Sequence, residues 1–489
     1  MMRSRSVSVG SRFAVGALAL FSLAFTACRA DAPSPSTPEA TFWPTPVETA
    51  RPAQPATSPP PIDPATLPHT QYRLSAALDY ARRQVSVSQT LTLVNRSSET
   101  WPDLILVVEP NRQPGVFHLK RLSGSDGQPI EGYTLEGARL NVPLITPIAP
   151  GATIGFALSY ELDLPNRPGP FGYTARQTNL GDWYPFAPVY RAGAGWVVHE
   201  PAVVGEHLVY DVADYEVEIS LTDPVSRVVI AASAALDGNA DRYKVDAARS
   251  FAWSASAEYQ ISNLQHGALT VTAYTFPEHT VSGEAALQAT ANALALYGER
   301  FAPYPHASLS LVEADFPDGM EYDGLYFLGE EYYAAYAGSP QNYLTAIAAH
   351  ETAHQWWSGL VGNDQAEEPW LDEALATYSE RLYYATMHPE LVDWWWEFRV
   401  TRFAPTGWVN SAIYDHNEFR SYVDAVYLRG AQFIEALRRL IGDAAFDAFL
   451  RDYTSRGREG QLTSADFFKV LAAHTPADLE PLIAQYFQR

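Results

Sequence analysis

The chain has 489 residues, enough for about three domains. Hydrophobic residues make up 47% of it and aromatic residues 13%, so a sizeable core can form and wholesale disorder is excluded. Acidic residues outnumber basic ones by 56 to 33, a net charge of −23 that argues against nucleic acid as a partner. A single cysteine excludes a disulfide framework and any cysteine-based metal site.

The amino-terminal segment has the features of a secretory signal. Basic residues precede an apolar run over residues 14–27, which is too short to span a membrane. The only cysteine, Cys28, follows directly, and the segment resembles a bacterial lipoprotein signal. The resemblance implies a signal peptide over residues 1–28, lipidation of Cys28, and anchoring to a bacterial membrane in the extracytoplasmic cell envelope. The alternative is an ordinary cleaved signal and a secreted protein.

A proline-rich segment comes next. Twelve of the chain's 36 prolines lie within residues 29–69, together with many Ser, Thr and Ala residues. Such a composition cannot bury a core, so we expect a disordered, extended tether. At about 3 Å per residue it could reach on the order of 100 Å from a membrane surface.

Residues 70–274 have the pattern of short β-strands. Apolar and polar residues alternate over 72–78, 85–94, 215–221 and 269–274, and turn-forming residues separate these runs. Alternation with a period of two is typical of half-buried antiparallel strands. We therefore expect an antiparallel β-sandwich as the amino-terminal domain of the folded body.

The hydrophobic period changes after about residue 275. Helical patterns cover 285–301, 343–358, 371–387 and 426–441, and a strand pattern covers 308–313. We expect residues 275–489 to form a second, mainly helical domain. The fold class predicted for the whole chain is therefore α+β and multidomain.

One cluster of residues carries the chemistry. His350 and His354 lie four residues apart within a predicted helix, so they share a face and can chelate one metal ion. Glu373 follows after 18 intervening residues, enough for one helix to end and another to begin facing the two imidazoles. Two His and one Glu leave zinc a fourth position for water, which is typical of a catalytic zinc site. Glu351 is then placed to accept the proton of that water.

These residues resemble the two-part zinc motif of the M1 family of zinc aminopeptidases, which belong to the gluzincins. The resemblance implies a thermolysin-like catalytic domain, one zinc ion per chain, and peptide substrates. It also covers Gly319, Met320 and Glu321, which resemble the family's Gly-Ala-Met-Glu-Asn motif and imply that Glu321 binds the substrate's free amine. Tyr427, in the order Tyr-Leu-Arg-Gly, matches the tyrosine that stabilises the oxyanion in the family.

The chain departs from the family pattern in three places. Tyr322 stands where the family motif has Asn, and the region 174–183 contains no clear equivalent of the family's second amine-binding residue. The 116 residues after Glu373 suffice only to complete the catalytic domain, so we expect a short form that lacks the helical carboxy-terminal domain. An incomplete amine site leaves a zinc endopeptidase as an alternative, and a non-catalytic surface-binding lipoprotein is a second one. The sequence indicates no oligomeric state.

Overall fold

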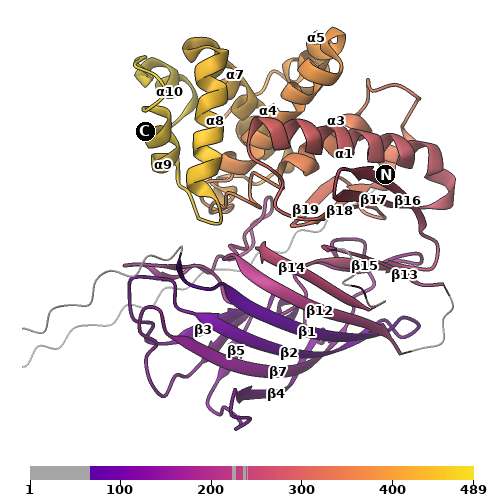
Figure 1. The fold of residues 1–489 in the computed structure, drawn as a ribbon, viewed down its shortest axis with the longest axis vertical. Coiled ribbons are helices and arrows are strands. Elements are labelled where there is room, and N and C mark those ends of the chain that lie inside the picture. Colours follow the sequence, from indigo (N-terminus) through magenta and orange to yellow (C-terminus); the bar gives the residue numbers. More distant parts are fainter. Residues whose placement is uncertain (1–65, 223–226, 235–237, 239–240, 489) are drawn as a thin grey trace, which may run out of the picture. The chain divides into compact units, whose positions relative to one another are not determined.

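A computed structural model describes residues 66–222, 227–234, 238 and 241–488 (Figure 1). The predicted signal peptide, Cys28 and nearly all of the predicted tether lie outside these residues. Among the helices that the structure describes, none is long and apolar enough to cross a membrane.

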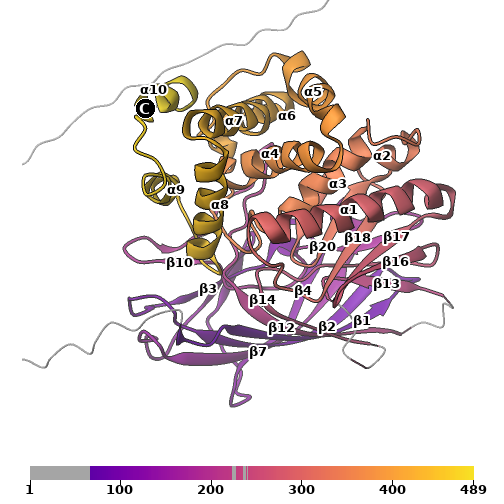
Figure 2. The same ribbon diagram turned by 45° about the horizontal axis from the view of Figure 1, so that its top comes forward.

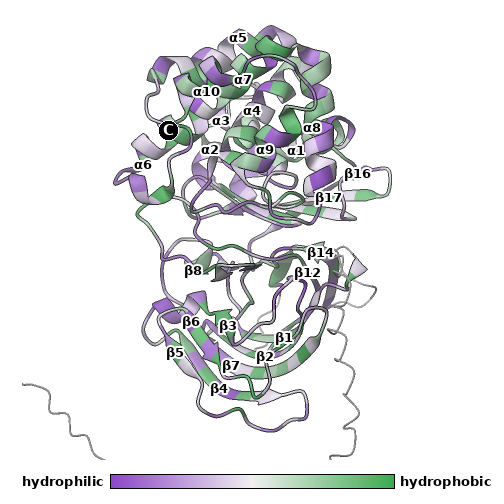
Figure 3. Cartoon of the chain, turned by 90° about the vertical axis from the view of Figure 1, so that its left-hand side faces the viewer, coloured by the Kyte–Doolittle hydropathy of each residue, from purple (hydrophilic) through white to green (hydrophobic). Residues whose placement is uncertain are grey.

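A six-stranded sheet is the largest element of the amino-terminal region. In spatial order its strands are β14 (Arg242–Ala248), β12 (Ala213–Leu221), β1 (Thr70–Asp79), β2 (Gln84–Val94), β7 (Thr153–Asp163) and β4 (Phe117–Gly124). Residues that face the core alternate along these strands with residues that face solvent, and Figure 3 shows the corresponding change between apolar and polar residues. The period-two pattern thus corresponds to one buried face.

Three smaller sheets complete the sandwich region. They are β3 (Leu104–Val107) with β6 (Arg139–Val142) and β5 (Thr134–Glu136); β13 (Val229–Ala232) with β15 (Trp253–Ser256), β9 (Thr178–Leu180) and β8 (Phe171–Tyr173); and β10 (Tyr190–Arg191) with β11 (Gly195–Trp196). Side chains from the first two of these pack with the six-stranded sheet in one apolar core, which contains Trp183 and Trp253. The predicted sandwich is confirmed, with one exception in strand direction: β1 pairs with β12 in parallel.

A second, five-stranded sheet belongs to the region predicted to be catalytic. Its spatial order is β16 (Gln260–His266), β17 (Leu269–Thr275), β18 (Ser308–Ala314), β20 (Leu325–Gly329) and β19 (Gly319–Tyr322). Strand β17 lies at the predicted domain boundary near residue 274, and it pairs with β18 and not with a strand of the sandwich. Alternation along a strand shows which residues are buried, and it does not show which sheet the strand joins.

Helices cover one face of this second sheet (Figure 2). The helices with the main contacts to the sheet are α1 (Thr280–Arg300), α2 (Glu330–Ala334) and α3 (Tyr343–Ala353). The others pack on these helices or on one another, and they are α4 (Trp370–Met387), α5 (Val392–Trp395), α6 (Phe419–Tyr422), α7 (Arg429–Ile441), α8 (Asp443–Gly457), α9 (Ser464–Leu471) and α10 (Glu480–Tyr486). Two π-helical segments, η5 (Trp396–Val400) and η8 (Val423–Leu428), interrupt the series. The predicted order of a β-rich region followed by a mainly helical one is confirmed.

One predicted helix is shorter than expected. The pattern over 343–358 predicted a helix up to Ser358, and α3 ends at Ala353 with His354 at its C-cap. The chain then turns, and Ser358 has a φ of 93°, a left-handed conformation that a helix cannot continue through. The apolar Trp356 and Trp357 are buried in this turn, so they prolong the hydrophobic pattern beyond the end of the helix.

The sandwich and the catalytic region are joined by buried contacts. A separate apolar cluster contains Ala231 and Ala252 from the sandwich together with Val312, Tyr322 and Phe327 from the second sheet. Nearby, the buried guanidinium of Arg249 donates hydrogen bonds to the carbonyl oxygens of Gly359 at 2.8 Å and Gly460 at 2.7 Å. These contacts fix the sandwich against the edge of the catalytic sheet where β19 lies.

Candidate active site

Helices α3 and α4 present the three predicted metal ligands. The side chain of Asn342 caps α3 by accepting a hydrogen bond from the amide of Thr345 at 2.9 Å. An alanine-rich sequence then carries His350 into the core, and His354 closes the helix. Glu373 lies in the first turn of α4, which packs against α3.

The three side chains converge on one point. The Nε2 atoms of His350 and His354 are 3.1 Å apart, and they lie 3.2 and 3.5 Å from Oε2 of Glu373. All three residues are at most 4% exposed. The two imidazoles outweigh the effect of burial and hold the pKa of the Glu373 carboxyl well below its ordinary value.

This donor set fits a zinc ion. Nitrogen and oxygen ligands at about 2 Å from a tetrahedral ion lie about 3.3 Å from one another, as these three atoms do. The remaining ring nitrogens are held by other groups. Nδ1 of His350 bonds to Glu380 at 3.0 Å, and Nδ1 of His354 donates to the carbonyl of Trp357 at 3.0 Å. Both Nε2 atoms are thereby left to face the metal position.

Glu380 is a residue that the sequence analysis missed. Its carboxylate is fully buried and also accepts hydrogen bonds from Nε1 of Trp395 at 3.0 Å and from Nε and Nη2 of Arg399 at 2.9 and 3.0 Å. Against the effect of burial, Arg399 and His350 hold the pKa of Glu380 below its ordinary value. A signal was present in the sequence, because Glu380 follows Glu373 by seven residues on the same face of one helix.

Glu351 lies beside the metal ligands in a tight pocket. Its side chain is buried, and its Oε2 atom has no hydrogen-bond partner among the described residues. Burial raises the pKa of Glu351 to about 8, which the charges of His350 and His354 partly oppose. On its other side lies Gly319, where an added Cβ would stand 2.0 Å from Oε1 of Glu351. The glycine therefore leaves the space in which the carboxylate sits.

Strand β19 brings Gly319, Met320 and Glu321 to the same place. One carboxylate oxygen of Glu321 accepts a hydrogen bond from Nε2 of Gln365 at 3.1 Å and lies 4.0 Å from Nδ1 of His354. Ligand-type atoms of Glu321, Glu351 and His354 lie within 4.8 Å of one another. Burial raises the pKa of Glu321, and the charge of His354 opposes that shift. Met320 lines the pocket described below.

Tyr427 comes from the π-helical segment η8. Its ring is stacked on that of His350, with centroids 5.9 Å apart and planes at 8°. Burial and the charge of Glu373 raise the pKa of Tyr427 well above its ordinary value, so the phenol keeps its proton. Tyr422 packs edge-on against Tyr427, and its buried hydroxyl has no partner in the described part of the chain. π-helical turns of this kind are frequent at functional sites.

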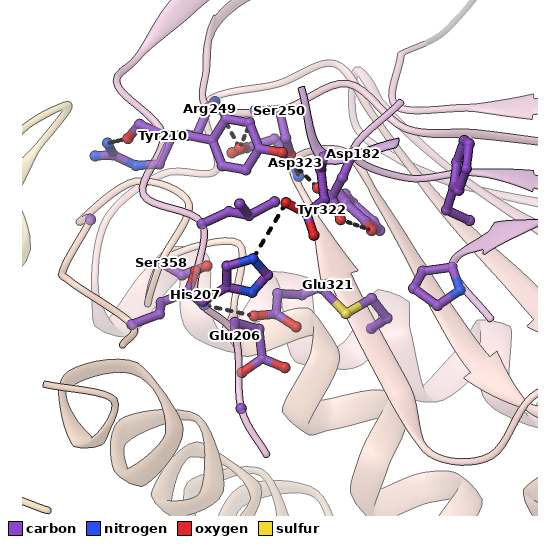
Figure 4. Close-up of a pocket in the computed structure, with 18 of the residues that line it drawn as sticks. Asp182, Glu206, His207, Tyr210, Arg249, Ser250, Glu321, Tyr322, Asp323 and Ser358 are labelled. Carbon is purple, nitrogen blue, oxygen red and sulfur yellow. Dashed lines mark hydrogen bonds and ion pairs between the residues drawn. The ribbon is translucent and has the colours of Figure 1, made fainter. Parts of the chain in front are cut away.

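A second carboxylate, Glu206, faces Glu321 and was also missed. It lies in the segment between β11 and β12 of the sandwich and lines a pocket of about 410 Å³ together with Glu321 (Figure 4). Burial, and after it the charges of Glu321 and Glu373, raise the pKa of Glu206 well above its ordinary value. The sequence search for such a residue covered 174–183, and Glu206 lies outside that range, in a segment without regular periodicity.

Comparisons with known proteins agree with this geometry. Residues 285–486 match the Peptidase family M1 domain. Aminopeptidase M1-D of Oryza sativa subsp. japonica is 28% identical over 219 residues, and endoplasmic reticulum aminopeptidase 1 of Homo sapiens is 27% identical over 233 residues. These matches cover 41% and 45% of this chain, and the chain spans about 25% of each relative.

A solved structure resembles nearly the whole described fold. A mutant of an M1 zinc metallopeptidase from Deinococcus radiodurans, bound to a Tyr-Ser-Ala substrate, superposes with a TM-score of 0.59 at 18% identity. The match covers 86% of this chain and 94% of that one. The expected arrangement of a β-sandwich before a mainly helical domain is thus confirmed. Zinc is the cofactor that the family match and the donor set both indicate.

Proposed function

We propose that this protein is a zinc-dependent aminopeptidase, which hydrolyses the first peptide bond of peptides with a free amino terminus. The observation that carries the proposal is the position of two carboxylates, Glu321 and Glu206, beside the three metal ligands and Glu351. A metal site with a neighbouring base is enough for hydrolysis of a peptide bond. The additional pair of acids gives a reason for the substrate to have a free ammonium group.

The proposed reaction divides the work among this chain's residues. Zinc held by His350, His354 and Glu373 would supply Lewis acidity to the scissile carbonyl and to the attacking water. In its ionised form Glu351 takes a proton from that water through its unpartnered Oε2 atom, as the oxygen attacks the carbonyl carbon. It then gives the proton to the nitrogen of the breaking carbon–nitrogen bond, so that a carboxylate and an amine leave.

Two further interactions position the substrate. The carboxylates of Glu321 and Glu206 bind the substrate's ammonium group, which holds the first peptide bond at the metal site. The phenol of Tyr427 donates a hydrogen bond to the oxygen that gains negative charge, since its raised pKa keeps the proton in place. Because Glu206 comes from the sandwich, both regions of the fold contribute to the substrate site.

A pair of matched peptides tests this function. Zinc-loaded protein is incubated with Tyr-Ser-Ala and with its amino-acetylated form, and the products are identified by mass spectrometry. We expect release of tyrosine from the free peptide and no cleavage of the acetylated one. Internal cleavage of longer peptides in both free and acetylated pools would indicate an endopeptidase. Absence of any cleavage by protein with bound zinc would leave the non-catalytic surface protein as the better interpretation.

We propose further that Cys28 carries a lipid that anchors the protein to a bacterial membrane. The support is the sequence alone, in which the only cysteine follows the apolar run of a signal. Expression with radiolabelled palmitate is expected to label the wild-type protein and not the Cys28→Ala variant. A wild-type protein that takes up no label and is found in the medium would indicate secretion instead.

A further inference from the structure

The pocket that contains the two amine-binding carboxylates continues away from the metal. It passes β19, the edge strand of the catalytic sheet, and reaches a group of polar residues from the sandwich. Asp182, Tyr210 and Tyr322 lie together at this end, as Figure 4 shows. A substrate whose ammonium group is held at Glu321 and Glu206 would have room here for the side chain of its first residue.

Asp182 is an acid without a lysine or arginine partner in the described part of the chain. Its Oδ1 atom accepts a hydrogen bond from the hydroxyl of Tyr210 at 2.6 Å, and its Oδ2 atom accepts one from Tyr322 at 3.1 Å. Among the residues that the structure describes, no lysine or arginine forms an ion pair with it, and the basic side chain whose charge acts on it is that of His207. Burial raises the pKa of Asp182 to about 6, so the carboxylate is still mainly charged at neutral pH.

The departure at Tyr322 from the family motif is explained by this contact. The residue stands where the family motif has Asn, and its hydroxyl reaches across to Asp182. Gly181 makes the contact possible, because an added Cβ at that position would lie 2.0 Å from the hydroxyl oxygen of Tyr322. Tyr322 and Gly181 thus place the carboxylate of Asp182 at the wall of the pocket.

Two further hydrogen-bond acceptors line the same pocket. Oδ1 of Asn363 and Oε1 of Gln461 are buried and have no partner within the described residues. Their amide nitrogens are already used, because that of Asn363 donates to the carbonyl of Glu368 at 3.2 Å and that of Gln461 to the carbonyl of Tyr210 at 2.9 Å. The pocket therefore offers acceptors to a ligand.

The cations of the pocket wall are bound elsewhere. Arg112 pairs with Glu109 at 2.8 Å and with Glu200 at 2.6 Å. Arg249 donates its hydrogen bonds to backbone carbonyl oxygens, as described above. Arg167 is exposed to solvent. His207, also in the wall, pairs with Glu109 at 3.4 Å, and its charge lowers the pKa of Asp182 without offsetting the effect of burial. Within the described residues, no arginine or lysine of this wall pairs with the carboxylate of Asp182.

We propose that this pocket binds the side chain of the substrate's amino-terminal residue and selects lysine or arginine there. The proposal rests on the aminopeptidase function stated above. A guanidinium group carries five N–H donors and a positive charge, and a lysine ammonium group carries three donors. Either group would place a positive charge beside the carboxylate of Asp182 and would offer N–H donors to the free oxygens of Asn363 and Gln461.

Arginine and citrulline provide the sharpest comparison, because they have nearly the same shape and differ in charge. Zinc-loaded protein is assayed with aminoacyl-coumarin substrates of arginine, citrulline, lysine and leucine. We expect kcat/KM for arginine to exceed that for citrulline by about ten- to a hundredfold, the usual effect of a hydrogen bond to a charged group. Equal values for arginine and citrulline, with both substrates cleaved, would overturn the proposal and leave the aminopeptidase function standing.

Two variants test the role of Asp182. Asp182→Asn is expected to reduce the ratio of arginine to citrulline to about one, and Asn tolerates the φ of 50° at this position. Asp163→Asn, an exposed change on the sandwich, serves as the control and is expected to keep the wild-type ratio. An Asp182→Asn variant with the wild-type ratio would contradict the assignment.

A binding measurement covers the case in which no substrate is cleaved. That outcome would refute the proposed function, and titration of zinc-loaded wild-type protein with L-arginine and with L-citrulline would then test the pocket by itself. Tighter binding of L-arginine by tenfold or more supports the pocket, and equal binding of the two amino acids overturns it. The same titration replaces the variant assay if Asp182→Asn does not fold.

Discussion

Glu380 is expected to determine how tightly the metal is held. The substitution Glu380→Gln keeps the size of the side chain and removes its charge. It weakens the hydrogen bond that orients His350, and it leaves the guanidinium of Arg399, a residue only 8% exposed, without its carboxylate. Loss of one partner of a buried ion pair costs about 3–5 kcal/mol of stability, and we expect the lower end because the amide still accepts hydrogen bonds.

The effect on zinc is separate from the effect on stability. Loss of a group that orients a metal-binding histidine typically lowers metal affinity by about ten- to a hundredfold, or about 1.4–2.7 kcal/mol. The zinc-loaded variant should therefore lose about 4–6 kcal/mol of unfolding free energy in total. Urea unfolding of the metal-free protein measures the first contribution. Competition with a chromophoric chelator gives the dissociation constant of zinc and measures the second.

Glu435 provides a matched control for this experiment. It is also a buried acid, 6% exposed, with arginine partners at Arg438 and Arg439, and it contacts none of the metal ligands. Glu435→Gln should lower the unfolding free energy and leave the zinc dissociation constant unchanged. A Glu380→Gln variant that binds zinc as tightly as the wild type would refute the reasoning, whatever its stability.

Three other changes have defined outcomes. Glu351→Gln should keep zinc and lower kcat by at least about 10²-fold. Gly319→Ala should have a similar effect, because the added Cβ displaces the Glu351 carboxylate. Zinc analysis and peptide assays check both variants, and near-wild-type turnover would contradict the prediction. His69 bonds Asp214 and Glu459, and the hydrogen bond to Asp214 raises its pKa above 6.5 against the opposing effect of burial. The contribution of His69 to the free energy of unfolding is therefore complete below about pH 6.5, and it is lost as the pH rises through the folded-state pKa. His69→Ala should lower the unfolding free energy by about 0.5–1 kcal/mol at acidic pH and by less at alkaline pH, and an equal loss at both would contradict this.

Sequence patterns located the parts of the site that depend on local structure. His350, Glu351 and His354 share one helix, and Glu373 begins the next, so helical spacing alone brought them together. Glu206 could not be found in this way, because it comes to Glu321 through the packing of two regions separated by more than a hundred residues. No periodicity marks the segment in which it lies.

The end of a helix and the sheet that a strand joins were also difficult to predict from the sequence. Burial in the core extends the apolar pattern through Trp356 and Trp357, beyond the true end of α3. Strand β17 alternates as sandwich strands do, and only its hydrogen bonds assign it to the catalytic sheet. The pattern of apolar residues shows whether a side chain is buried. Which element it packs against is determined by the fold as a whole.

Because Glu206 comes from the sandwich, the docking of the two regions bears on which peptide bonds the proposed enzyme can cleave. The metal ligands and Glu351 belong to two adjacent helices, whereas the groups proposed to bind the free amine and the first side chain come together only when the sandwich is docked. An opened molecule would therefore keep its hydrolytic centre and lose its restriction to chain ends. Under the proposed function, the buried hydrogen bonds of Arg249 at this junction would preserve the restriction to chain ends as well as the fold.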